Sequence, residues 1–97
     1  MDTKTLKDKF LAEQPKELID KLTPPFHALI DETIESVIDG STTIDGKKAV
    51  TADEAITLVR YGVLARTKLF QQTILEAKQL PADSVTINYR GTILKVK

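Results

Sequence analysis

The apolar residues in the first part of the chain recur at helical spacing in two separate segments. Pro15 interrupts the segment from Thr5 to Leu22, and proline breaks or kinks a helix, so we expect two short helices or one bent helix there. Residues 23–25, Thr-Pro-Pro, then supply an N-cap followed by proline in the first turn. The apolar positions that follow predict a second amphipathic helix, which ends at Gly40.

The start of a third helix is marked by a capping box. The Thr51 hydroxyl can accept the amide of Glu54, and the Glu54 carboxylate can reach back to the amide of Thr51. Val50 can also pack against Ala55 as a hydrophobic staple. We therefore expect a helix that begins directly after Thr51.

This third helix is predicted to be the longest, because its apolar period continues to Leu80 and Pro81 ends it. Uninterrupted, it would span residues 52–80, which is about 43 Å. Further apolar residues lie away from its main stripe: Leu58, Tyr61, Leu64, Leu69 and Leu75. A helix that is apolar over much of its circumference is buried on more than one side. One chain of 97 residues can hardly cover it, so we predict an oligomer interface there.

Two segments favour β-structure. Asp45-Gly46 suits a type I′ turn, so residues 41–51 form either a short hairpin or an exposed loop. The tail from Val85 to Val96 alternates apolar and polar positions around a turn at 90–91, Arg-Gly, which predicts a hairpin. Together these elements predict one α+β domain over residues 1–97, with three or four helices, one of them long, and a small antiparallel β-hairpin sheet at the C-terminus.

The formal net charge of zero is a cancellation between two unlike halves. Residues 1–45 carry five lysines against ten acids, and residues 46–97 carry nine basic residues against four acids, for balances of −5 and +5. The acids of the second helix form one candidate face: Asp31, Glu32, Glu35 and Asp39. This face is either a solvated helix surface or a docking surface for a basic partner, such as the basic half of a second copy.

Arg66 falls inside the apolar stripe of the third helix, where an unpaired charge costs several kcal/mol. It therefore needs an anionic partner. The candidates are a carboxylate of Asp31, Glu32 or Glu35, a carboxylate of a second subunit, or a bound phosphate.

The residues that usually carry chemistry are scarce. The chain has no cysteine, which excludes disulfides, zinc-finger sites and thiol catalysis, and its one histidine, His27, has no triad partner at a catalytic spacing. The acids do not follow a calcium-loop pattern, and the glycines are too scattered for a phosphate loop. We predict no catalytic, cofactor or metal site and no enzyme. With a charged amino terminus and no apolar run of membrane-spanning length, we expect a cytosolic protein that does not enter the membrane.

The order helix, hairpin, helical segment, final hairpin over residues 51–97 resembles a winged helix-turn-helix. In that resemblance residues 53–60 are the first helix, Tyr61-Gly62 lie near the turn, residues 67–80 are the recognition helix and the final hairpin is the wing. The resemblance implies DNA binding. It places four side chains in the major groove, Lys68, Gln71, Gln72 and Lys78, and two at the phosphates, Arg90 and Lys95.

Three functions fit these patterns. The favoured one is a small non-enzymatic interaction protein, a homo-oligomer that binds another macromolecule. The second is a winged-helix-like DNA-binding protein or regulator. The third is a binder of a phosphorylated small ligand in a cleft between subunits, held by Arg60, Arg66 and Lys68. The candidate partner- or anion-binding residues across all three are Arg60, Arg66, Lys68, Gln71, Lys78, Arg90 and Lys95.

Overall fold

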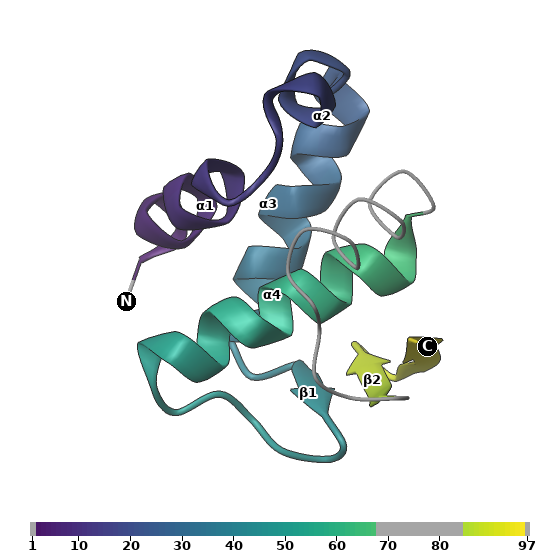
Figure 1. Ribbon diagram of the computed structural model, residues 1–97. Helices are drawn as coiled ribbons and strands as arrows, with labels where there is room; N and C mark the ends of the chain where they lie inside the picture. The colour runs from purple at the N-terminus through teal and green to yellow at the C-terminus, as the bar shows by residue number, and fades with distance from the viewer. Residues whose placement is uncertain (1, 68–84, 97) are drawn as a thin grey trace.

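A computed structural model describes residues 2–67 and 85–96 of the chain. Its elements, in chain order, are α1 (Thr3–Ala12), α2 (Lys16–Asp20), α3 (Pro24–Ile38), β1 (Thr42–Ile44), α4 (Ala52–Arg66), β2 (Val85–Tyr89) and β3 (Thr92–Val96). The described part thus holds four helices and a three-stranded antiparallel sheet, which confirms the predicted α+β class. Helix α4 runs between α1 and α3 on one side and the sheet on the other (Figure 1).

The two proline-marked helix boundaries are where the sequence predicts them. Helix α1 ends before Pro15, which is itself the N-cap of α2, so this segment forms two short helices. Thr23 is the N-cap of α3 through its extended backbone alone, without a hydrogen bond from its side chain. After α3 the chain turns at Gly40, whose φ of 83° favours glycine.

The capping box at the start of α4 is confirmed. The amide of Glu54 donates to Thr51 Oγ1 at 3.1 Å, and the amide of Thr51 donates to Glu54 Oε1 at 3.0 Å. The predicted hydrophobic staple is wrong, because Val50 is 79% exposed. The same Glu54 oxygen also accepts the amide of Val50 at 3.2 Å, and this bond holds the backbone of Val50 at the surface, beside the cap.

The carboxyl end of α4 differs from both predictions for residues 52–80. The helix ends at Arg66, and Thr67 has extended backbone angles of −149° and 135°, so the single continuous helix is wrong. β-branched threonine accepts this extended conformation more readily than most residues do. The turn expected near Tyr61 and Gly62 is also wrong, because both residues are buried within α4. The rest of the predicted recognition helix, from residue 68 onward, lies outside the described residues.

Helix α4 is the centre of the hydrophobic core. Its buried residues surround the helix axis: Ala55, Ile56, Leu58, Val59, Tyr61, Gly62, Val63 and Leu64. Helices α1 and α3 and all three strands pack against it. Leu58, Tyr61 and Leu64, which the sequence assigned to an oligomer interface, are covered within one chain, so that part of the prediction is wrong. Leu69 and Leu75 lie outside the described residues. No helix in the described part is long and apolar enough to span a bilayer.

The sheet joins one short edge strand, β1, to the predicted C-terminal hairpin. Asp45 and Gly46 both have positive φ, 48° and 82°, so the turn forms, and it closes with a bridge between Ile44 and Lys47. Strand β1 nevertheless pairs with β2, more than 40 residues further along the chain, and the sheet order is β1-β2-β3. The cross-strand neighbours Ile44, Ile87 and Leu94 share the face that packs on the core.

Helices α3 and α4 are in close contact where Gly62 meets Thr33. A Cβ atom added at Gly62 would lie 2.7 Å from Cγ2 of Thr33, a distance that real Cβ contacts essentially never show. Thr33 is fully buried, so its methyl group has no room to move aside. This position therefore requires a residue without a side chain, despite the cost of glycine within a helix.

We expect Gly62→Ala to lower the free energy of unfolding, because forcing a methyl group into a packed core costs about 1–3 kcal/mol, more than the roughly 1 kcal/mol that alanine gains in a helix. Urea denaturation followed by circular dichroism measures the change. The matched control is the double variant Gly62→Ala/Thr33→Ser, which removes the clashing methyl and keeps the hydroxyl. Its stability should recover most of the loss. A double variant that is no more stable than Gly62→Ala would contradict this explanation.

Candidate functional site

The acidic face of α3 meets basic residues of the same chain. The ion pairs are Asp31 with Lys7 of α1 at 2.9 Å, Glu32 with Arg66 of α4 at 3.3 Å, and Asp39 with Arg90 of the final hairpin at 3.7 Å. Glu35 lies on this helix as an exposed residue. Two of these pairs, Glu32 with Arg66 and Asp39 with Arg90, therefore join the acidic half to the basic half within one chain, whereas Asp31 and Lys7 both belong to the acidic half.

Arg66 has the carboxylate partner that its place in the apolar stripe requires. Its Nη2 donates to Glu32 Oε2 at 3.3 Å, and its Nη1 donates to Thr33 Oγ1 at 3.0 Å. The guanidinium carbon lies over the ring of Tyr89, 4.0 Å from the ring centroid, which is a close cation–π contact. With 19% of its side chain exposed, Arg66 joins α3, α4 and β2.

Arg60 is held by a different carboxylate, on another element. Its Nε donates to Oε1 of Glu13 at 2.9 Å and its Nη2 donates to the other carboxylate oxygen, so the pair is bidentate. This hydrogen bonding raises the pKa of Arg60 above its ordinary value. Glu13 is the C-cap residue of α1, whereas Arg66 contacts α3 and β2. The structure therefore does not bring Arg60 and Arg66 together as one anion site.

The remaining candidate residues are placed only in part. Arg90 is at the tip of the β2–β3 hairpin, and its guanidinium carbon is 5.8 Å from the centroid of the Tyr89 ring. Lys95 is an exposed residue of β3. The other candidates lie outside the described residues: Lys68, Gln71, Gln72 and Lys78.

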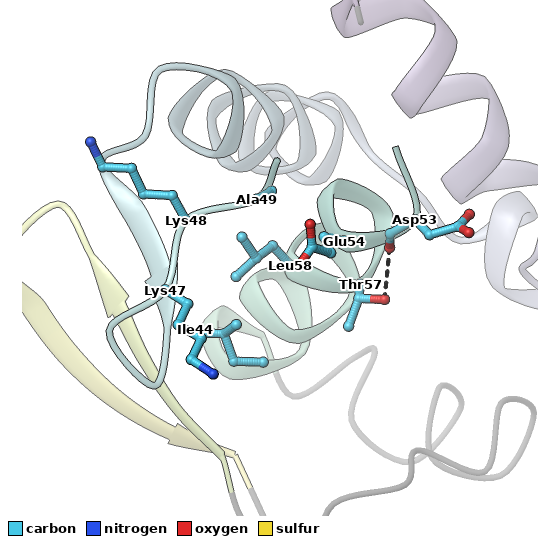
Figure 2. A pocket seen from close by; sticks show the side chains of 8 residues that line it. All are labelled: Ile44, Lys47, Lys48, Ala49, Asp53, Glu54, Thr57 and Leu58. Atoms are coloured by element: carbon cyan, nitrogen blue, oxygen red, sulfur yellow. Dashed lines mark hydrogen bonds between the residues drawn. The ribbon is translucent and has the colours of Figure 1, made fainter. Parts of the chain in front are cut away.

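A pocket of about 240 Å³ opens between the turn after β1 and the first turns of α4 (Figure 2). It is lined by Ile44, Lys47, Lys48, Ala49, Asp53, Glu54, Thr57 and Leu58. Ile44 and Leu58 point into it, whereas the ammonium group of Lys48 and the carboxylate of Asp53 point away. The walls that remain are largely aliphatic.

Three of the charged side chains around this pocket are engaged elsewhere. The Asp53 carboxylate lies 3.9 Å from the ammonium group of Lys9, the Glu54 carboxylate completes the cap, and the stem of Lys48 lies against Gly40. An apolar group is therefore the chemistry that the pocket accommodates best. Three large apolar side chains in the described part are exposed: Val50 at 79%, Ile93 at 57% and Ile38 at 40%.

Sequence reasoning missed several residues of this arrangement. Nothing in the sequence marks Glu13 as the partner of Arg60, because the two residues are 47 positions apart. Thr33 looked like an ordinary polar residue of α3, and only its contact with Gly62 shows that it is part of the core. Two features of the sequence mark the two sides of the pocket, namely Asp45-Gly46 and the capping box, but they do not indicate the pocket itself.

In the described ranges, no three side chains of histidine, aspartate or glutamate come together as a metal site. Comparisons with protein-family models, with curated proteins and with solved structures find no match to this chain.

We expect Arg66→Ala to lower the free energy of unfolding by about 1–3 kcal/mol, because hydrogen bonds to a charged group and a cation–π contact are lost together. Arg66→Lys should recover only part of the loss, since an ammonium group lacks the planar fork that contacts Glu32, Thr33 and Tyr89 together. Urea denaturation measures both variants. A lysine variant as stable as wild type would show that the charge alone is sufficient.

Stability at acid pH should depend on Asp39. Hydrogen bonds from the Ser41 hydroxyl and amide, and the charge of Arg90, lower the pKa of Asp39 in the folded chain. Its contribution is therefore fully present above the unfolded pKa of about 3.9 and is lost as the pH falls through the lower folded pKa. Urea denaturation over an acid pH series should show a weaker pH dependence for Asp39→Asn than for wild type.

The matched control for this series is Glu35→Gln, which changes another acid of the same helix and leaves the Asp39 contacts in place. Its pH profile should run parallel to that of wild type. If the Asp39→Asn profile is equally parallel, the hydrogen bonds to Asp39 do not contribute to folding stability.

Proposed function

We propose that this chain is a small non-enzymatic interaction protein of the cytosol, a homo-oligomer that binds another macromolecule through apolar contacts. The observation that carries the proposal is the contrast between its charged and apolar surface groups. Arg60 and Arg66 are already held by carboxylates of the same chain, whereas Val50 is exposed and lies in the chain between two residues that line an apolar pocket.

The charge distribution supports the same proposal. A protein that binds phosphates needs guanidinium and ammonium groups that are free to face the ligand. Here Arg90 lies near Asp39, and Lys7 is paired with Asp31. These exposed pairs are individually weak, worth about 0–1 kcal/mol, but each one reduces the positive potential at its position.

Isolated exposed apolar residues are normal on a soluble protein, so exposure alone is weak support. The pocket adds to it, because an aliphatic cavity is a site that an apolar side chain of a partner can fill. Burial of apolar surface is the usual main source of affinity between proteins. An apolar interface is therefore the contact that the described surface supports best.

Native mass spectrometry of the full chain purified from its host tests this proposal. We expect species heavier than the single chain of 10.8 kDa that contain protein and persist at high salt, because apolar contacts are not screened. Lys95→Ala is the control variant and should retain these species. Only a 10.8 kDa monomer would overturn the proposal.

A binding assay with the purified protein distinguishes the DNA-binding alternative, which one observation favours: Arg90 and Lys95 are exposed on the C-terminal hairpin that the winged-helix resemblance takes as the wing. In that case random-sequence duplex should bind at low salt and dissociate steeply as salt rises. Lys95→Ala should then weaken the binding. Under our proposal neither the salt-sensitive binding nor the effect of Lys95→Ala is expected.

A further inference from the structure

We propose that two copies of this chain pair through the open edge of β3, so that their two sheets form one continuous antiparallel sheet. This inference rests on the proposed function, since it names the surface through which the homo-oligomer forms. Strand β3 is the last strand in the order β1-β2-β3, and the described part of the chain places no strand on its other side (Figure 1). An edge strand of this kind presents unpaired amides and carbonyls that another strand can bind.

The opposite edge of the sheet is closed by the chain itself. The amide of Ile44 in β1 donates to the carbonyl of Lys47 at 3.0 Å, and the amide of Lys47 donates to the carbonyl of Ile44 at 2.8 Å. Thr42, at the start of the same strand, is fully buried. Within the described residues, the edge of β3 is therefore the one that is open to a partner.

The hydrogen bonds of β2 show which groups of β3 face this open edge. In an antiparallel pair, opposite residues either bond to each other or both point their main-chain groups away from each other. Thr86 is opposite Lys95, yet the carbonyl of Thr86 accepts the amide of Asp45 at 2.9 Å, on the β1 side. Lys95 therefore turns its amide and carbonyl to the open edge. Asn88 lies two residues after Thr86 and has the same direction, so its partner Ile93 also faces the open edge.

The open edge is complementary to itself. A twofold axis at Leu94, between antiparallel strands, brings Ile93 of one copy opposite Lys95 of the other, and the reverse. Each of these pairs exchanges two hydrogen bonds, so every open-edge amide and carbonyl of the two residues gains a partner. Such an isologous contact is the commonest way that a protein forms a dimer.

The side chains of the edge suit the same register. Ile93 is 57% exposed, and Lys95, two residues further on, is exposed on the same face of the sheet. In the twofold register the aliphatic stem of each lysine covers the isoleucine of the other copy, while its ammonium group stays in water. On the opposite face, Leu94 is partly buried against the core and meets Leu94 of the other copy. A second copy therefore offers apolar surface to this edge and places no like charges directly opposite each other.

The edge is already ordered before a partner binds. Both residues of the β2–β3 turn, Arg90 and Gly91, have positive φ, 48° and 93°, and the amide of Gly91 donates to Oδ1 of Asn88 at 2.8 Å. Positive φ at both central positions defines a type I′ turn, whose twist matches that of the flanking strands. Pairing with a second copy therefore costs little further backbone entropy.

Sedimentation and light scattering of the full chain test the proposal. Wild type should be a dimer. Lys95→Pro should be a monomer, because proline removes an amide that faces the open edge. Its far-UV circular dichroism spectrum should be unchanged, since the bonds between β2 and β3 do not use this amide and proline is tolerated on edge strands. Lys95→Ala is the matched control, which keeps the amide and should remain a dimer.

A second pair of variants tests the register without proline. Ile93→Lys places an ammonium group opposite Lys95 of the other copy, whereas Ile93→Glu places a carboxylate there. Both remove the same apolar side chain, and they change the net charge of zero by equal amounts of opposite sign. At low salt Ile93→Glu should therefore dimerise about tenfold more tightly than Ile93→Lys, and added salt should reduce this difference. Equal dimer Kd values at low salt would show that the register is wrong.

Cross-linking locates the contact, because the chain has no cysteine of its own. Ile93→Cys and Lys95→Cys, prepared separately and then mixed under mild oxidation, should form a disulfide-linked heterodimer in excess of random pairing. The Cα atoms of a hydrogen-bonded antiparallel pair are about 5.5 Å apart, which is within the range of a disulfide. A product no richer in heterodimer than random pairing would contradict the proposed edge contact.

The remaining outcomes separate this inference from the proposed function. A wild-type oligomer that Lys95→Pro leaves intact would overturn the edge pairing and leave the interaction protein standing. A wild-type monomer that binds a different protein, and loses it on Lys95→Pro, would show that β3 takes a strand of another sequence and that a second copy is not the occupant. A wild-type monomer without any co-purified macromolecule would overturn both.

Discussion

The contact between Gly62 and Thr33 is the constraint on which the rest of the structure depends. Without a side chain at Gly62, α3 and α4 come close enough for the Thr33 methyl to fill the gap. The hydroxyl of the same Thr33 donates to the carbonyl of Leu29 at 2.8 Å and accepts from Arg66. Gly62 and Arg66 are four residues apart, so they lie on the same side of α4. Thr33 therefore determines both the spacing of α3 and α4 and the position of the Arg66 guanidinium.

Arg66 extends that constraint from the helices to the sheet. Its guanidinium lies over the ring of Tyr89, the last residue of β2, which pairs with Thr42 of β1. The fully buried Thr42 in turn donates to Ser36 of α3 at 2.6 Å, so the sheet is tied back to α3 by a second route. The uneven charge of the sequence has its explanation here. An acidic helix lies among basic neighbours, and their ion pairs help to specify which elements meet.

The features that the sequence predicted correctly are those with local causes. The helix boundary at Pro15, the capping box at Thr51 and the final hairpin each depend on a few adjacent residues. At Asp45-Gly46 the sequence left a hairpin and an exposed loop open. The end of α4 was not predictable from periodicity, because the apolar period continues past Arg66. Strand β1 could not be assigned to β2 either, since only three residue pairs join them and the connection is long.

The candidate site was predictable only as a set of alternatives. The sequence required an anion beside Arg66 and offered three acids of α3, but the choice of Glu32 follows from the helix spacing set at Gly62. The sequence also does not show which distant residues pack on α4, so this helix was predicted to be too apolar for one chain to cover. The sheet covers it, and two of the strands lie beyond residue 84.

Charged and apolar side chains are treated differently at the surface of this fold. Several charged groups pair within the chain, and one large apolar side chain, Val50, is exposed in the β1–α4 loop. The capping box fixes the backbone at Val50. One oxygen of Glu54 accepts hydrogen bonds from the amides of Val50 and Thr51 and from the Thr51 hydroxyl. The same bonds therefore cap α4 and fix the backbone of the loop that precedes it. The side chain of Val50 is 79% exposed beside this cap and does not form the staple with Ala55 that often accompanies a capping box. Because these hydrogen bonds already fix the backbone at Val50, contact with a partner at this loop costs little further backbone entropy.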